Sequence, residues 1–310
     1  MELVILSERI VAYLKVIAAM TIVGSSVVAG KILIQTMPIF LASELRFLVA
    51  SLILVPLLIY KEGIPSLSKR DIVILFFQSL MGVFLFSIFM LYGLKYTTAM
   101  EAGIVTSTLP AMVALLAYFI IKEKLTRNKI AGIITAILGV IILNVSGVMQ
   151  EISGSHLEIV GNFLVLGAVM GEALFIILGK SISKKVSPLT ITTGVSVIGG
   201  LLFLPMAIYD SITANYSFGS GYDWLLIFYF GMVVTVLAFL LMYQGLAVLS
   251  AATVGILTSV LPLSTVVLSF FLLKEPLYYY HLIGLCLIFM AIYFSSREEK
   301  IQMDQGIGNN

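Results

Sequence analysis

Glu172 is an acidic residue in the middle of an apolar segment that extends over about residues 159–182. A charged side chain inside a membrane costs about 2.5–3.5 kcal/mol on insertion scales, so such a residue is a candidate for function. The carboxylate could bind a cationic group of a ligand. It could also accept and release a proton, because burial disfavours the charged form of a carboxyl group. The structural alternative is a protonated or paired carboxyl group that only joins helices.

Three other charged residues, Glu44, Arg46 and Glu101, also fall within apolar segments. Residues two positions apart do not face each other on a helix, so Glu44 and Arg46 neutralise each other poorly. We therefore expect a partner for Arg46 from another helix, such as Glu101. A structural ion pair of Arg46 near the outer membrane surface, with Glu44 or Glu101 as the acid, is the favoured interpretation. Glu101 is also a candidate for ligand binding or coupling.

Pro110 and Pro262 each fall near the middle of an apolar segment. A proline inside a helix removes the hydrogen bond to the carbonyl group four residues earlier and kinks the helix. The carbonyl groups freed in this way belong to Thr106 and Thr258, and hydroxyl groups, water or a ligand must satisfy them, since lipid cannot. We expect the two broken helices to face each other and to line a cavity or act as hinges. Helix packing alone is the alternative, because proline is common in membrane helices.

Weaker signals come from polar residues at other positions in the apolar segments. The polar ends of Tyr92 and Gln244 could contact a ligand, although tyrosines in membrane proteins mostly form interfacial belts. Lys15, Lys31 and Lys180 lie near the ends of apolar segments, where their long side chains can reach the lipid headgroups. We expect these lysines to orient the chain and to have no role in transport beyond that.

Several kinds of chemistry find no support in the sequence. It has no Gly-Lys-Ser/Thr phosphate loop, so nothing indicates that ATP drives it. His156 and His281 lie far apart, and Cys286 is the single cysteine, so neither a metal site nor a disulfide framework is expected. No basic cluster suggests nucleic acid. We therefore expect no cofactor and no enzymatic activity.

The elements that position these residues follow from the composition. The 310 residues are 60% hydrophobic and 11% charged, with a mean hydropathy of +1.13. A soluble domain carries about 25% charged residues, so this chain is predicted to be an all-α polytopic membrane protein. Spans of about 20 residues fit ten predicted transmembrane helices. They cover about residues 10–30, 38–60, 72–94, 97–121, 129–147, 159–182, 188–209, 222–247, 251–273 and 279–295.

Residues 98–140 align without a gap with residues 250–292. The aligned positions include Gly103, Pro110 and the pair Lys122-Glu123, which an apolar composition does not reproduce by chance. The chain is therefore interpreted as two five-helix repeats, as is usual in secondary transporters. The predicted organisation is a first repeat at 10–147, a linker at 148–158, a second repeat at 159–295 and a cytoplasmic tail at 296–310.

The positions of lysine and arginine predict the orientation of the chain. Most of the 18 basic residues fall on the inner side if the N-terminus is cytoplasmic. Both termini are then cytoplasmic, and an odd number of helices per repeat inverts the second copy. The loops agree, because the basic loop at 122–129 corresponds to a loop at 274–281 with a single lysine. The sequence therefore predicts inverted repeats with a ligand site near the membrane midplane.

These features resemble the EamA-like branch of the drug/metabolite transporter superfamily. The resemblance covers both repeats and is carried by Leu109-Pro110 with Glu123 and Gly132, Leu261-Pro262 with Glu275 and Gly284, Gly24-Ser-Ser-x-x-x-Gly30-Lys31, and Arg46-Phe47. It implies ten helices around a central cavity that is lined by spans 1, 3, 4, 6, 8 and 9. It also implies export of metabolites such as amino acids. Relatives often carry an aromatic or small residue in the sixth span, so Glu172 favours a cationic substrate or proton coupling.

We therefore expect a secondary transporter of the inner cell membrane that exports an amino acid, an amine or a related polar metabolite by alternating access. Its partners would be a small-molecule substrate, the lipid bilayer and, if it is coupled, protons, and it would act as a monomer or a homodimer. Two alternatives stay open. A nucleotide-sugar or phosphate carrier should show intramembrane basic residues, of which only Arg46 qualifies. A membrane-embedded enzyme or a lipid-handling protein should show clustered carboxylates, histidines or a lateral polar groove, and the sequence has only scattered carboxylates and histidines.

Overall fold

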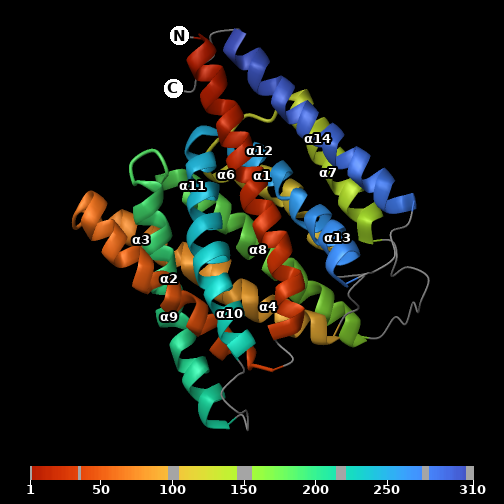
Figure 1. Cartoon of the computed structure of the whole chain (residues 1–310). Coiled ribbons are helices and arrows are strands. Elements are labelled where there is room, and N and C mark those ends of the chain that lie inside the picture. Colours follow the sequence, from red (N-terminus) through yellow and green to blue (C-terminus); the bar gives the residue numbers. More distant parts are fainter. Residues whose placement is uncertain are drawn as a thin grey trace. The chain divides into compact units, whose positions relative to one another are not determined.

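The computed structural model describes residues 2–33, 36–96, 105–144, 156–213, 221–273 and 279–304. These residues form helices joined by short connections, and the described part contains no strand (Figure 1). Within it, seven helical stretches are long and apolar enough to cross a membrane: Ser7–Ser26, Ile39–Glu62, Lys69–Gly93, Ile159–Ile182, Pro188–Thr213, Gly221–Val248 and Ala251–Leu268. Two shorter apolar helices cover Leu109–Ile120 and Tyr279–Ser295. The prediction of an all-helical membrane protein is confirmed, whereas ten spans and cytoplasmic termini stay predictions.

The chain divides into two compact units, and each unit takes helices from both halves of the sequence. Unit 1 comprises residues 1–85 and 178–249. Its helices are α1 (Glu2–Leu33), α2 (Ile39–Glu62), α3 (Lys69–Ser79), η1 (Leu80–Leu85), the end of α8 (His156–Ile182), α9 (Pro188–Thr213), α10 (Gly221–Tyr229), η3 (Phe230–Leu237) and α11 (Ala238–Val248).

In unit 1, α2 packs on α9 and η3, and α1 packs on α11. Phe47 of α2 stacks on Phe203 of α9 with ring centroids 5.9 Å apart. Gly231 of η3 lies against Val49, and Gly245 of α11 lies against α1, so that any side chain at either glycine would collide. Small residues allow membrane helices to approach closely, and here they join helices from opposite halves of the chain.

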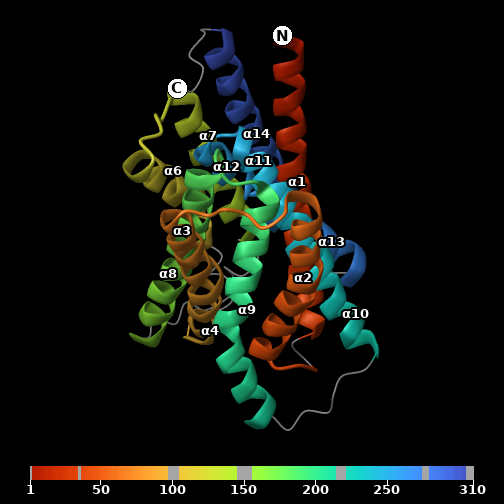
Figure 2. The same ribbon diagram turned by 90° about the vertical axis from the view of Figure 1, so that its left-hand side faces the viewer.

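Unit 2 comprises residues 86–177 and 250–310. Its helices are α4 (Phe86–Tyr96), α6 (Leu109–Ile120), α7 (Arg127–Asn144), α8 up to residue 177, α12 (Ala251–Leu257), α13 (Val260–Leu273) and α14 (Tyr279–Asp304). The main contact lies between α7 and α14, which run side by side in Figures 1 and 2. A Cβ atom at Gly139 would lie 3.2 Å from the carbonyl oxygen of Gly284, and a Cβ atom at Gly132 would lie 3.2 Å from that of Ala291. Glycine is therefore what permits this contact.

Two helices of unit 1 contain a stretch of π-helix. The stretches are η1 at Leu80–Leu85 and η3 at Phe230–Leu237, and they occupy corresponding positions of the two repeats. In η3 the hydroxyl group of Thr235 donates to the carbonyl oxygen of Phe230 at 2.9 Å. π-Helical stretches are rare and occur often at functional sites, and here the two repeats carry them at matched positions.

Candidate functional site

Both proline-containing segments are broken helices, and the break comes just before the proline. In the second repeat α12 ends at Leu257, Thr258 and Ser259 form a turn, and α13 begins at Val260. In the first repeat a turn at residues 107–108 precedes α6, which begins at Leu109. Pro110 and Pro262 therefore lie in the first turn of a new helix, where a missing N–H group is tolerated. The kink expected from each proline takes the form of a short turn between two helical segments.

The backbone groups at the second break are satisfied within the chain. The carbonyl oxygen of Thr258, which we expected Pro262 to free, accepts a hydrogen bond from the N–H group of Leu261 at 3.0 Å. The Thr258 hydroxyl group donates to the carbonyl oxygen of Gly255 at 2.6 Å, and the Ser259 hydroxyl group to that of Ile256 at 2.6 Å. The hydroxyl groups of Thr258 and Ser259 thus provide hydrogen bonds to carbonyl groups one turn earlier. A helix break inside a membrane needs such internal partners, because lipid offers none.

The broken segments of the two repeats lie next to each other in unit 2. Helix α12 packs against α6, and a side chain at Gly255 would begin 2.9 Å from Val113. Ala114 of α6 and Ala252 and Ile256 of α12 belong to one buried cluster. The expected juxtaposition of the two broken helices is therefore present for α6 and α12.

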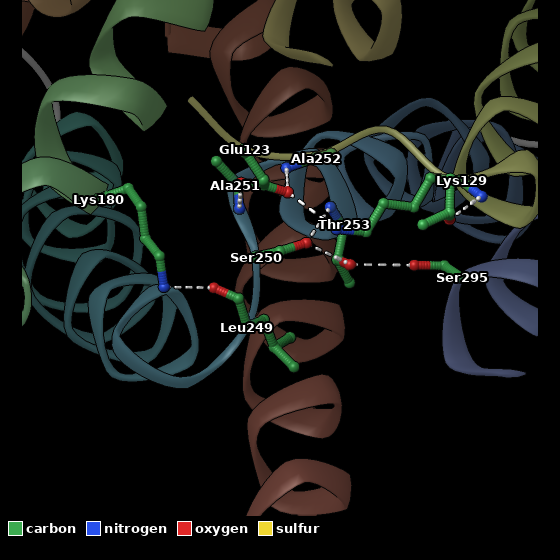
Figure 3. A network of polar contacts seen from close by, with 10 residues as sticks. Glu123, Lys129, Lys180, Leu249, Ser250, Ala251, Ala252, Thr253 and Ser295 are labelled. Carbon is green, nitrogen blue, oxygen red and sulfur yellow. Dashed lines mark hydrogen bonds and ion pairs between the residues drawn. The ribbon is translucent and has the colours of Figure 1, made fainter. Parts of the chain in front are cut away.

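A carboxylate from the connection after α6 caps the N-terminus of α12 (Figure 3). Glu123 accepts hydrogen bonds from the N–H groups of Ala251 at 3.0 Å and Ala252 at 3.4 Å. Its other contact is an ion pair with Lys129, with Nζ 3.0 Å from Oε1. The side chains of Lys129 and Glu123 are only 3% and 14% exposed. A buried carboxylate at a helix N-terminus is stabilised by both the unpaired N–H groups and the helix dipole.

Hydroxyl groups complete the cap of α12. The side chain of Ser250 accepts from the Thr253 N–H group at 3.1 Å, and its hydroxyl group donates to Thr253 Oγ1 at 2.8 Å. Ser295 of α14 donates to the same oxygen at 3.2 Å. Thr253 is the counterpart of Glu101, so the first repeat has a carboxylate where the second has this hydroxyl group. Glu101 itself lies outside the described residues.

Lys180 binds the C-terminus of α11 within unit 1. Its Nζ donates to the carbonyl oxygens of Leu246 at 2.8 Å and Leu249 at 2.6 Å, and the second bond is drawn in Figure 3. A cation there interacts favourably with the negative end of the helix dipole. Lys180 was expected to reach the lipid headgroups, and in the structure its ammonium group has these two carbonyl oxygens within reach.

Glu172 lies near the middle of the membrane-spanning part of α8 and is half-buried. Among the described residues it has no hydrogen bond and no ion pair. The neighbouring positions Ala168, Val169, Ala173 and Ile176 are buried and apolar. Glu172 is therefore a carboxyl group in apolar surroundings without a protein partner in this part of the chain.

Glu44 and Arg46 do not form an ion pair with each other in the described structure. The guanidinium carbon of Arg46 lies 4.6 Å from the ring centroid of Phe47, and its Nε is buried without a partner there. The Glu44 carboxylate lies beside Gly200 of α9, and its Oε2 is likewise buried without a partner. Their spacing of two residues directs the side chains to different faces of α2. A pair with Glu101 falls outside the described residues.

Tyr92 and Gln244 lie in different units. Tyr92 is 45% exposed on α4, whereas Gln244 of α11 lines a cavity of unit 1 together with Glu8 and Lys15 of α1. Lys15 was expected only to orient the chain, and it lies in this lining as well. The spacing of seven residues between Glu8 and Lys15 places both on one face of the first span, and this pattern could have predicted that they line the same space.

The neighbouring Tyr243 belongs to a buried polar contact in unit 1. The Gln78 amide group donates to the Tyr243 hydroxyl group at 2.9 Å, and both side chains are fully buried. Gly179 of α8 lies against both, since a side chain there would begin 2.7 Å from Gln78 Nε2. This buried hydrogen bond joins α3 to α11 within unit 1.

Comparison with known proteins gives a consistent picture. The sequence profile of the EamA-like transporter family matches residues 10–145 and 159–297. Bacillus subtilis (strain 168) has a relative, "Uncharacterized transporter YetK", that is 43% identical over 298 residues, covering 96% of this chain and 90% of that protein. An "Uncharacterized transporter" of Archaeoglobus fulgidus is 28% identical, over 84% of this chain and 89% of that protein. A solved crystal structure with a TM-score of 0.78 and 17% identity covers 92% of this chain and 98% of that one, which shows the fold alone.

Proposed function

This chain belongs to the EamA-like transporter family, and we propose that it is a secondary transporter that exports a small polar metabolite across the cell membrane by alternating access. The proposal includes ten spans in two inverted repeats with both termini in the cytoplasm. The substrate would be an amino acid, an amine or a related compound. Family membership supports the transport activity itself, and the substrate and direction are our inference.

The position of Glu172 is the main support for a cationic substrate group or for proton coupling. A carboxyl group near the middle of a span, without a polar partner in the described structure, is available to a cationic group or a proton. We assign substrate binding or proton coupling to Glu172, with contributions from Glu101, Thr106, Thr258, Tyr92 and Gln244. Pro110 and Pro262 would serve as hinges or gates, at which the two broken helices move during transport. The sequence offers no ATP-binding loop, so a gradient or an exchanged solute must supply the energy.

The test is transport by purified protein in proteoliposomes, preceded by a thermal-shift screen of amino acids, amines and other polar metabolites at about pH 6 and pH 8. A ligand that binds the folded protein stabilises it by about 2.7 kcal/mol at a hundred times its dissociation constant. For Glu172→Gln we expect binding weakened about 10- to 100-fold, because a hydrogen bond to a charged group is lost, together with loss of pH dependence.

Asp210→Asn is a matched control, because it also replaces a carboxylate by an amide but lies near the end of α9. It should leave transport and its pH dependence unchanged. Unaltered transport and pH dependence in Glu172→Gln would remove the central role of Glu172. Stabilisation by particular lipids, with no response to any solute, would contradict metabolite export and favour a lipid substrate.

A further inference from the structure

Exposed basic side chains gather at one end of the helices of unit 1. They come from the last turn of α2, the first turn of α3 and the connection between α8 and α9. These side chains, which we call the basic surface, are Lys61, Lys69, Arg70, Lys184 and Lys185. The first three belong to the first repeat and the last two to the second, so folding brings together charges that are far apart in the sequence.

Hydrogen bonds hold the segments of the basic surface side by side. The carboxylate of Glu62, at the end of α2, accepts from the hydroxyl groups of Ser187 at 2.5 Å and Thr190 at 3.0 Å, at the start of α9. Helix α3 packs on α9 as well. The ends of α2 and α8 and the beginnings of α3 and α9 therefore form one region of unit 1.

The positive charge of this region is not neutralised by the residues around it. The nearby Asp71 carboxylate accepts from the hydroxyl group of Ser68 at 2.6 Å and from its N–H group at 3.1 Å, and Arg70 and Lys185 lie within its electrostatic reach. No side chain of the basic surface forms a hydrogen bond or an ion pair with another described residue. Five cations thus face two carboxylates that are already bound to hydroxyl groups.

The exposed face of α3 continues from charge into apolar surface. Ile72, Val73 and Phe76 are exposed and lie three, four and seven residues after Lys69, so all four share one face of the helix. The face extends about 10.5 Å along the helix axis from Lys69 to Phe76. A phospholipid has the same order of groups, with a charged headgroup followed by apolar chains.

We propose that the basic surface binds the headgroup of an anionic phospholipid, with an acyl chain along Ile72, Val73 and Phe76 of α3. Each lysine or arginine near a membrane surface strengthens the attraction to anionic lipids about fivefold. A zwitterionic lipid would bring its own ammonium group to five cations, so the surface selects a net negative headgroup. The proposal concerns the membrane and does not depend on which solute is transported.

The experiment measures lipid preference in the purified full-length protein, which is already inserted and oriented. Thermal unfolding midpoints are compared in micelles with phosphatidylcholine, with phosphatidylglycerol and without lipid, and bound lipids are counted by native mass spectrometry. The natural protein should be stabilised more by phosphatidylglycerol, and the difference should shrink at high salt. Basic residues that serve only to orient the chain would give no preference at this stage.

The double variant Arg70→Gln with Lys185→Gln tests the basic surface directly. It should bind phosphatidylglycerol about 20- to 30-fold more weakly. Lys124→Gln with Arg127→Gln is the matched control, because it removes the same two residue types from exposed positions of unit 2 and should keep the preference. Arg70→Lys with Lys185→Arg retains both charges and should keep it as well. All variants should have similar midpoints in phosphatidylcholine, since none of the replaced side chains bonds to a described residue.

Three results would overturn the proposal. The first is equal stabilisation by the two lipids, and the second is an equal loss of preference in the double variant and its matched control. The third is stabilisation by soluble glycerol phosphate as strong as that by phosphatidylglycerol, which would assign the surface to a free phosphate group. A transported lipid would still stabilise the double variant of the basic surface, so the outcome is distinct from failure of the proposed metabolite export.

Discussion

At the scale of single residues, glycines decide how closely the helices of each unit approach. Gly245→Val should destabilise the protein by about 1–3 kcal/mol, because the new side chain collides with Val16 and the overpacked helices must separate. The thermal unfolding midpoint in detergent measures this effect. Gly221→Ala is the control, since no atom lies within 4 Å of a side chain at Gly221. Equal midpoints for the two variants would contradict the close packing of α1 and α11.

The buried contact between Gln78 and Tyr243 gives a second residue-scale prediction. Tyr243→Phe removes the acceptor of the Gln78 amide group inside the protein. We expect a loss of about 1–3 kcal/mol in the free energy of unfolding, as for other buried groups that lose a partner. The double variant with Gln78→Leu should recover part of this loss in a denaturation series. Additive effects of the two substitutions would show that the hydrogen bond has little weight.

Residues that mark local structure can be predicted from the sequence, whereas residues that act on distant parts of the chain cannot. The repeated Thr-Ser-x-Leu-Pro pattern located both helix breaks, because proline limits the backbone locally. The partners of Lys180 and Glu123 could not be predicted, since each binds the end of a helix far away in the sequence. The roles of Glu172, Arg46 and the other candidate residues stay predictions.

At the scale of helices, the cap of α12 depends on one charged pair. Glu123→Ala removes two hydrogen bonds from the helix N-terminus and leaves Lys129 buried without its partner. Breaking a buried pair by removing one member costs about 3–5 kcal/mol. The protein should therefore unfold at a markedly lower temperature, and adding Lys129→Met should restore part of the stability. A double variant no better than Glu123→Ala alone would assign the loss to the helix cap and not to the buried charge.

The positions of the prolines lead to another helix-scale prediction. Pro110 lies in the first turn of α6, where proline is compatible with a helix and no hydrogen bond is missing. Pro110→Ala should therefore change stability by less than about 1 kcal/mol, through the unfolded chain alone. Transport rates and unfolding midpoints measured on the same preparation separate stability from gating. A strong stabilisation would indicate that alanine allows α6 to extend through the break.

At the scale of the whole molecule, composition and repeats were sufficient for the fold class, and the compact units were not foreseen. Apolar content predicts membrane helices because lipid requires satisfied backbone groups. Which helices pack together depends on the shapes of their faces, as with Gly245 against Val16 or Gly139 against α14. Each unit combines helices from both repeats, so a repeat in the sequence is not a compact unit in space.

Because each unit combines helices from both repeats, the first helices of unit 1 are synthesised well before the helices on which they pack. Unit 1 begins with α1 and needs α11, which ends at Val248. Ribosomes add about 5–20 residues per second, so on the order of ten to thirty seconds pass between the completion of η1 and the emergence of α11. During this interval the face of α1 that packs on α11 has no partner, and α2 has none until α9 and η3 have been made. The insertion machinery or the surrounding lipids must shield them, which makes newly made chains most vulnerable to proteolysis before translation has finished.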